Sequence, residues 1–130
     1  MTQPIEVKSL APILVVDAIE LVLPFWVDRL GFAVVTTVPD ASPYVFAIVA
    51  RDGAQVMLQT RASGGEDLNV DLGTVGASLV YITVAALDPV LVALGDAADI
   101  VVPRRTTFYG ADEIFVRDPA GNLIGLAAFA

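Results

Sequence analysis

The sequence predicts an α+β fold made of two similar βαβββ modules in tandem, because its segments occur twice in the same order. The segments "ARDGAQVMLQ" (50–59) and "VRDPAGNLIGLA" (116–127) share Arg-Asp, a glycine turn and an alternating apolar strand, at an offset of 66 to 69 residues. The segments "PILVVDAIELVLPFW" (12–26) and "LVYITVAALDPVLVAL" (79–94) are each an apolar strand that runs into a helix, at an offset of 69. Two matches in the same order at nearly the same offset indicate an internal repeat.

The helix signals agree with this order of elements. Asp17 and Glu20 have the spacing of a capping box at the start of the first helix, and Gly31 is expected to end that helix. Pro24 falls inside it and is expected either to kink the helix or to mark its true start. Asp88-Pro89 is expected to start the second helix as N-cap and first helical residue.

We expect one domain over residues 1–130, because a chain of this length is large enough for one core but short for two independent ones. The modules are expected at about 1–62 and 77–130. The segment "RASGGEDLNVDLGTVGA" (61–77) between them is polar and rich in glycine. We interpret residues 63–76 as a linker that is long enough to act as a flap.

Each module contains a hairpin whose turn fixes the faces of its strands. Asp52-Gly53 forms a two-residue turn that pairs Arg51 with Ala54, whereas Arg117 to Asn122 combines proline, glycine and two self-capping side chains. Counting outward from the first turn gives an aliphatic face that we expect in the core: Ala47, Val49, Val56 and Leu58. The opposite face is expected to line a cavity, or else to be exposed or buried in a dimer: Tyr44, Phe46, Ile48, Met57, Gln59 and Arg61.

The composition excludes several kinds of site. The chain has no cysteine, so disulfides, thiol nucleophiles and thiolate metal sites are excluded. It also has no histidine, which excludes Ser-His-Asp and Cys-His triads and zinc sites built on imidazole. Carboxylates and tyrosines are left for acid–base chemistry.

The net charge of −8, from 7 basic and 15 acidic residues, makes nucleic acid an unexpected partner and favours a cationic small molecule. The unbroken apolar runs, such as Leu21 to Val27, are far too short to span a bilayer. The start "MTQPIEVKSL" lacks the features of a signal peptide. We therefore expect a cytoplasmic protein without a membrane partner.

Four stretches resemble the vicinal oxygen chelate superfamily, the glyoxalase / bleomycin-resistance / dioxygenase fold. They are "PILVVD" (12–17), "FWVDRLGF" (25–32), "YITVAALD" (81–88) and "YGADEIFVRDPAGN" (109–122). The chain looks most similar to the drug-binding, bleomycin-resistance branch. The resemblance implies two βαβββ modules with curved mixed sheets that form a cleft, usually in a homodimer.

The same resemblance places the metal ligands of the superfamily's enzymes at Leu10, Met57, Leu79 and Gly125 of this chain. None of these residues can bind a divalent metal. We therefore expect no metal, no cofactor and no catalytic residue of the glyoxalase or dioxygenase type.

In drug-binding members of the family, aromatic side chains in the cleft stack on a planar ligand. Here Phe108 and Tyr109 are expected at the rim, Gly110 to bend the chain beside them, and Gly125 to leave open space for a ligand ring. Tyr81 and Thr83 are counted onto the strand face of Leu79. The expected ligand-binding residues are aromatic, thioether and amide side chains: Tyr44, Phe46, Met57, Gln59, Tyr81, Phe108 and Tyr109.

The chain departs from drug-binding relatives at "AVVTTVPDAS" (33–42), which lacks the aromatics and most of the acidic residues found there. This departure argues against bleomycin itself as the ligand. Glu113 matches a family glutamate, but it is counted onto the face opposite to Ile114 and Gly125 and assigned a structural role. Phe25-Trp26 matches a pair that packs a helix on the sheet, so we expect both in the core.

Three functions remain open. The first is a dimer that sequesters a small aromatic antibiotic or metabolite, with a cationic one favoured by charge. The second is a metal-independent enzyme that uses Glu113, Asp112 or a tyrosine as acid or base. It would need a carboxylate in the cleft with a raised pKa. The third is a structural or regulatory dimer with vestigial clefts.

Overall fold

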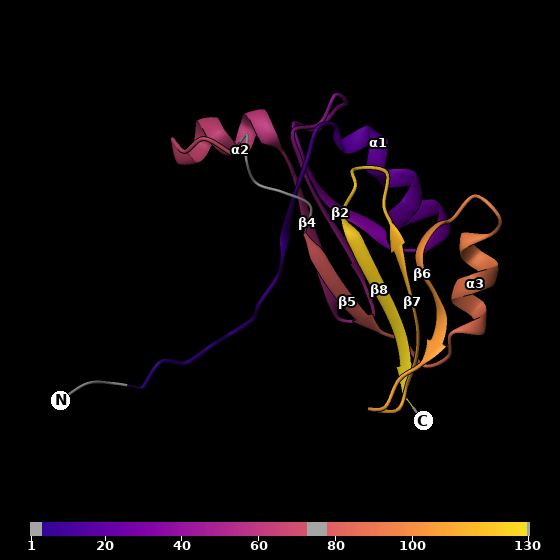
Figure 1. Ribbon diagram of the computed structural model, residues 1–130. Coiled ribbons are helices and arrows are strands. Elements are labelled where there is room, and N and C mark those ends of the chain that lie inside the picture. The colour runs from indigo at the N-terminus through magenta and orange to yellow at the C-terminus, as the bar shows by residue number, and fades with distance from the viewer. Residues whose placement is uncertain (1–3, 73–77, 130) are drawn as a thin grey trace.

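The structure is a computed structural model that describes residues 4–72 and 78–129. Its elements repeat one order, strand–helix–three strands, with a further helix between the repeats (Figure 1). The first part contains β1 (Ile13–Val16), α1 (Ile19–Leu23), the π-helical turn η1 (Pro24–Arg29), β2 (Ala33–Val38), β3 (Phe46–Arg51), β4 (Ala54–Thr60) and α2 (Arg61–Leu68). The second part contains β5 (Leu79–Thr83), α3 (Asp88–Leu94), β6 (Asp99–Thr106), β7 (Ala111–Arg117) and β8 (Leu123–Phe129).

The strands form two four-stranded sheets with equivalent orders, β1-β4-β3-β2 and β5-β8-β7-β6. In each sheet the first pair is parallel and the other two pairs are antiparallel. The two mixed sheets confirm the predicted α+β fold of tandem βαβββ modules. No helix in the described part of the chain has both the length and the apolar character needed to cross a membrane.

Both predicted hairpin turns form. Asp52 and Gly53 have φ of 49° and 85°, and Arg51 pairs with Ala54 as predicted. In the second turn, the Asp118 carboxylate accepts hydrogen bonds from the backbone N–H groups of Ala120 (3.0 Å) and Asn122 (2.8 Å). The face predicted for the core from the first turn is buried: Ala47, Val49, Val56 and Leu58 are at most 4% exposed.

The first helix does not start with the predicted capping box. Its N-cap is Ala18, without a side-chain cap, so the prediction for Asp17 and Glu20 is wrong. Glu20 instead accepts hydrogen bonds from the Ser42 hydroxyl and the Tyr44 backbone N–H, both at 2.7 Å, which fastens the 39–45 loop to α1. The exposed glutamate binds these donors in place of its own helix terminus.

Pro24 marks the change from α1 to the wider turn η1, and the helix ends at Gly31 as predicted, with φ of 75°. The second helix starts one residue earlier than predicted. Asp88 is its first residue, Leu87 is its N-cap, and the Asp88 carboxylate pairs with Arg104 instead of capping.

Part of the predicted linker is helical. Residues 61–68 form α2, in which the Thr60 hydroxyl accepts a hydrogen bond from the Ser63 backbone N–H (3.2 Å) and Asn69 ends the helix with φ of 53°. These caps supply helix-end hydrogen bonds that offset the low helix propensity of Gly64 and Gly65. Residues 73–77, which belong to the predicted flap, lie outside the described residues.

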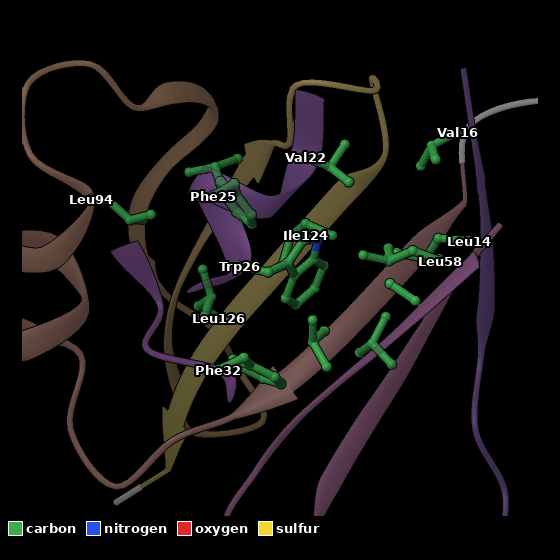
Figure 2. Close-up of a cluster of buried hydrophobic side chains, with 14 of the residues drawn as sticks. Leu14, Val16, Val22, Phe25, Trp26, Phe32, Leu58, Leu94, Ile124 and Leu126 are labelled. Atoms are coloured by element: carbon green, nitrogen blue, oxygen red, sulfur yellow. The ribbon is translucent and has the colours of Figure 1, made fainter. Parts of the chain in front are cut away.

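Buried residues of both sheets belong to one core cluster around Trp26 (Figure 2). The Trp26 side chain is 0% exposed, and its ring lies edge-on to Phe25 at 5.4 Å and to Phe32 at 5.3 Å between centroids. Leu58 of the first sheet and Ile124 of the second sheet are part of the same cluster. The prediction that Phe25 and Trp26 are core residues is therefore confirmed.

Candidate functional site

The second sheet presents a row of side chains on the face opposite to the core cluster. On β5, Leu79, Tyr81 and Thr83 are exposed, while Val80 and Ile82 pack against the core. The alternation confirms the prediction that Tyr81 and Thr83 share a face with Leu79. In register, Tyr81 pairs with Gly125 of β8, and Gly125 pairs with Phe115 of β7.

The space above Gly125 is filled by two aromatic rings. A Cβ atom at Gly125 would lie 2.6 Å from the Phe115 ring and 2.8 Å from the Tyr81 ring. Those two rings have centroids 6.1 Å apart and are tilted by 38°. The expectation that Gly125 leaves room for a ligand ring is wrong, because the glycine lets Phe115 and Tyr81 close over the strand.

Glu113 lies on this same face and is 0% exposed. It pairs with Ala127, two residues from Gly125 along β8, so the expectation that Glu113 faces away from Gly125 is wrong. Its Oε1 accepts hydrogen bonds from the hydroxyls of Tyr81 (2.6 Å) and Tyr109 (3.0 Å). Its Oε2 accepts two more, from Nε (2.9 Å) and Nη2 (2.7 Å) of Arg105.

These hydrogen bonds favour an ionised Glu113 and a neutral Tyr81. The Tyr81 hydroxyl, followed by Arg105 and Tyr109, holds the pKa of Glu113 below its usual range, in spite of burial. The hydrogen bond to Glu113 raises the pKa of Tyr81 well above the usual range for a phenol. On the other face of β7, the Arg104 guanidinium lowers the pKa of Asp112. Neither carboxylate has the raised pKa that acid–base catalysis would need.

Three further rings extend this face beyond Glu113. The turn at residues 107–110 places Phe108 fully exposed and Tyr109 half exposed, and Gly110 has φ of 88°, as expected for the bend there. The Tyr109 ring lies 5.0 Å from Phe108 and 6.4 Å from Phe129, the last residue of β8. We call the five rings and Glu113 the aromatic face: Tyr81, Phe108, Tyr109, Glu113, Phe115 and Phe129.

The sequence analysis missed Phe115 and Phe129. Both follow from the second turn, because Arg117 pairs with Leu123 and every second residue from that pair lies on one face. Counting back from Arg117 gives Phe115 and Glu113, and counting forward from Leu123 gives Gly125 and Phe129.

Three other predicted ligand residues, Phe46, Met57 and Gln59, lie on the first sheet, on the face opposite to its core side. Phe46 pairs with Gln59 there, and Ile48 pairs with Met57, as the hairpin count predicted. The Gln59 amide donates to the Ser63 hydroxyl of α2 at 3.4 Å. The prediction that Tyr44 shares this face is wrong, because Tyr44 precedes β3 and packs against the core cluster.

Within one chain these residues form two groups, one on each sheet. A hollow of about 540 Å³ lies between the modules and is lined mainly by residues 29–32 and 82–86, together with Arg51, Asp52 and Ala54. None of the described ligand candidates lines it. Each group therefore lies outside this hollow, on its own sheet.

The four positions that correspond to metal ligands hold no suitable donors. Leu79 and Gly125 are on the second sheet, Met57 is on the first sheet, and Leu10 precedes β1. In the described ranges, 4–72 and 78–129, histidine, cysteine, aspartate and glutamate side chains nowhere gather in a group of three that could hold a metal ion. The residues present do not fit the metal site of the superfamily's enzymes.

The hydrogen bond from Tyr81 to Glu113 predicts unusual alkaline behaviour. A phenol with a raised pKa in the folded state contributes stability that is present below its unfolded pKa, about 10, and is lost as the pH rises through the folded value. We expect part of the phenolate absorbance at 295 nm to appear only well above pH 10, together with a falling free energy of unfolding. Tyr81→Phe should abolish that late part, whereas Tyr44→Phe should leave it in place. A late step that survives in Tyr81→Phe would contradict the assignment.

Comparison with known proteins agrees with this architecture. Residues 8–126 match the family described as the Glyoxalase/Bleomycin resistance protein/Dioxygenase superfamily. No curated protein matches the sequence. The structure is similar to TioX from Micromonospora sp. ML1, with a TM-score of 0.80 and 22% identity over 95% of this chain and 99% of that chain.

It is also similar to the bleomycin-binding protein of Streptomyces verticillus, which was solved in complex with copper(II)-bleomycin. That similarity has a TM-score of 0.66 and 22% identity over 98% of this chain and 100% of the other. A glyoxalase/bleomycin resistance protein/dioxygenase from Nocardioides has a TM-score of 0.73 and 15% identity, over 97% and 86% of the two chains. At these identities the neighbours show the fold alone. With the family match over nearly its whole length, the chain belongs to the glyoxalase/bleomycin resistance protein/dioxygenase superfamily.

Proposed function

We propose that this protein is a metal-free binding protein that sequesters a small aromatic antibiotic or metabolite in the cytoplasm. The observation that carries the proposal is the aromatic face, in which one buried carboxylate holds two tyrosines beside further rings. Rings held in fixed positions bind a planar molecule by stacking without a large loss of side-chain entropy. Aromatic rings that are held and still accessible therefore suit binding better than core packing.

The polar groups of this face favour binding over the alternative, a metal-independent enzyme. Glu113 accepts four hydrogen bonds and has a lowered pKa, so it is a poor base for a substrate proton. Asp112 lies on the opposite strand face and forms a bidentate ion pair with Arg104. The Tyr81 hydroxyl donates a hydrogen bond to Glu113 and has a raised pKa, so Tyr81 is a poor general acid.

The exposure of the two sheet faces supports a homodimer. Leu79 is 65% exposed, Phe108 is fully exposed and Phe129 is 47% exposed on the second sheet, and Ile13 is 51% exposed on the first. Large apolar side chains exposed on a sheet face are typical of contact surfaces. In the proposed dimer, the Phe46, Met57 and Gln59 group of one copy covers the aromatic face of its partner. A ligand would then lie between the two sheets.

Antibiotic sequestration is the form of this function that the bleomycin-binding neighbour supports. The comparison concerns a fold at 22% identity, so the ligand itself is proposed from the residues of this chain. They select flat, aromatic molecules and contain no donor set for a divalent metal.

Replacing Tyr109 with Ala should weaken the binding of a planar aromatic ligand by about 1–3 kcal/mol, because one stacking ring is lost. Ligands would be found by thermal-shift screening of planar aromatic compounds, and their dissociation constants measured by calorimetry. Ile100→Ala is the matched control, since Ile100 is an exposed apolar residue of β6 that pairs with Val116 on the core side. If Tyr109→Ala lowers the melting temperature while affinity stays unchanged, the ring is structural and the proposed site is wrong.

The dimer should give about twice 13.6 kDa by light scattering at micromolar concentration. Met57→Lys should shift the mass toward the monomer, because it buries a charge in the proposed interface. Val92→Lys, on the exposed side of α3, should leave the dimer intact. A wild-type monomer at high concentration would contradict the proposal.

A further inference from the structure

We propose that Arg105 makes this site select aromatic ligands that carry an anionic or carbonyl oxygen next to the ring, and disfavour cationic ones. The inference rests on the proposed function, since it names the ligand class of the aromatic face. It differs from the expectation drawn from the net charge of −8, which favours a cation.

One edge of the Arg105 guanidinium is hydrogen-bonded to Glu113, and the rest of the group is accessible to a ligand. Its Nε and Nη2 donate to Oε2 of Glu113, at 2.9 Å and 2.7 Å. Neither of these hydrogen bonds uses its Nη1, and the only other side chain that interacts electrostatically with the guanidinium among the described residues is Tyr109. The side chain is 51% exposed, and its guanidinium carbon lies 6.0 Å from the centroid of the Phe115 ring. A donor with a full charge therefore stands beside a ring of the aromatic face.

The two charges of the Arg105–Glu113 pair differ in accessibility. The Glu113 side chain is 0% exposed, behind Tyr81 and Tyr109, whereas half of the Arg105 side chain is open to solvent. A ligand on this face thus meets the guanidinium and not the carboxylate. Because short-range hydrogen bonds and nearby charges are screened less than distant ones, this contact should outweigh the overall negative charge of the chain.

The tyrosines do not duplicate this donor. Both phenol hydrogens are used on Oε1 of Glu113, so Tyr81 and Tyr109 present only oxygen lone pairs to a ligand. A carboxylate, phenolate or carbonyl oxygen therefore needs Arg105. A hydroxyl or N–H elsewhere on the ligand could be accepted by the phenol oxygens.

Arg104, which precedes Arg105 on β6, uses its guanidinium entirely for hydrogen bonds within the protein. Its Nε and Nη2 donate to Asp112, at 2.9 Å and 2.8 Å, and its Nη1 donates to Asp88 at 2.8 Å. All three nitrogens are used, and Asp112 lies on the strand face opposite to Glu113. Arg104 is thus a matched control for Arg105.

The test compares three probes with the same ring: 2-naphthoate, 2-naphthamide and 2-naphthylmethylammonium. Dissociation constants are measured at neutral pH by ligand-observed NMR on the wild type, Arg105→Gln, Arg105→Lys and Arg104→Gln. We expect the wild type to bind 2-naphthoate about tenfold more tightly than 2-naphthylmethylammonium, as for one charge-assisted hydrogen bond. Arg105→Gln should abolish this preference while 2-naphthamide keeps most of its affinity. Arg104→Gln should preserve the preference.

Arg105→Lys is a second variant in case Arg105→Gln does not fold. Lysine keeps a positive charge beside Glu113, but it lacks the further guanidinium nitrogen that would donate to a ligand. This variant should fold and lose most of the preference. Equal affinity for the three probes in the wild type, with loss of all three in Tyr109→Ala, would overturn this inference and leave the proposed function standing. Tighter binding of the cation would also overturn it. If none of the probes binds at millimolar concentration, the proposed function is overturned together with the inference.

Discussion

The buried carboxylate of Glu113 is the constraint on which the arrangement of the second sheet's open face depends. A carboxylate that is fully removed from solvent is strongly unfavourable unless charge and hydrogen bonds compensate for the lost hydration. Here the compensation comes from Tyr81 on β5, Arg105 on β6 and Tyr109 in the turn before β7. Satisfying this one group fixes the side chains of three segments. Phe115 packs beside Tyr81, and Phe129 lies beside Tyr109.

The internal repeat explains why only one of the two sheets carries such a group. Both modules have a hairpin that follows Arg-Asp, but the first turn has two residues between its closing pair and the second has five. Carrying the first hairpin across at the offset of 66 places Glu113 at the position of Ala47, which is buried in the core. In the structure Glu113 instead lies on the open face, the face that carries Phe46 in the first sheet. The longer turn shifts the faces by one residue relative to Arg-Asp, and it brings a glutamate to a face where the first sheet has a phenylalanine.

The sequence was sufficient to predict the fold, the first hairpin and the packing of Phe25 and Trp26, because these depend on local turn chemistry and apolar periodicity. It was insufficient for the carboxylate network, whose members Tyr81 and Glu113 are 32 residues apart and meet only after strands pair. The pairing of β6 with β7 also shifts register on either side of Val102, which a count along the strand does not reveal. The helix at 61–68 was missed for a simpler reason: its stability comes from caps at Thr60 and Asn69, while its interior contains two glycines.

The central claim is that Glu113 holds the tyrosines for a ligand, and a double-mutant cycle tests it directly. The affinity for 2-naphthamide is compared in the wild type, Tyr109→Phe, Glu113→Leu and the double variant, each first shown to be folded by circular dichroism. Leucine lacks the oxygen that accepts the Tyr109 hydrogen bond, so loss of the Tyr109 hydroxyl should weaken binding in the wild-type background and have little further effect in the Glu113→Leu background. The same loss in both backgrounds would contradict the account, because the hydroxyl and the carboxylate would then act independently.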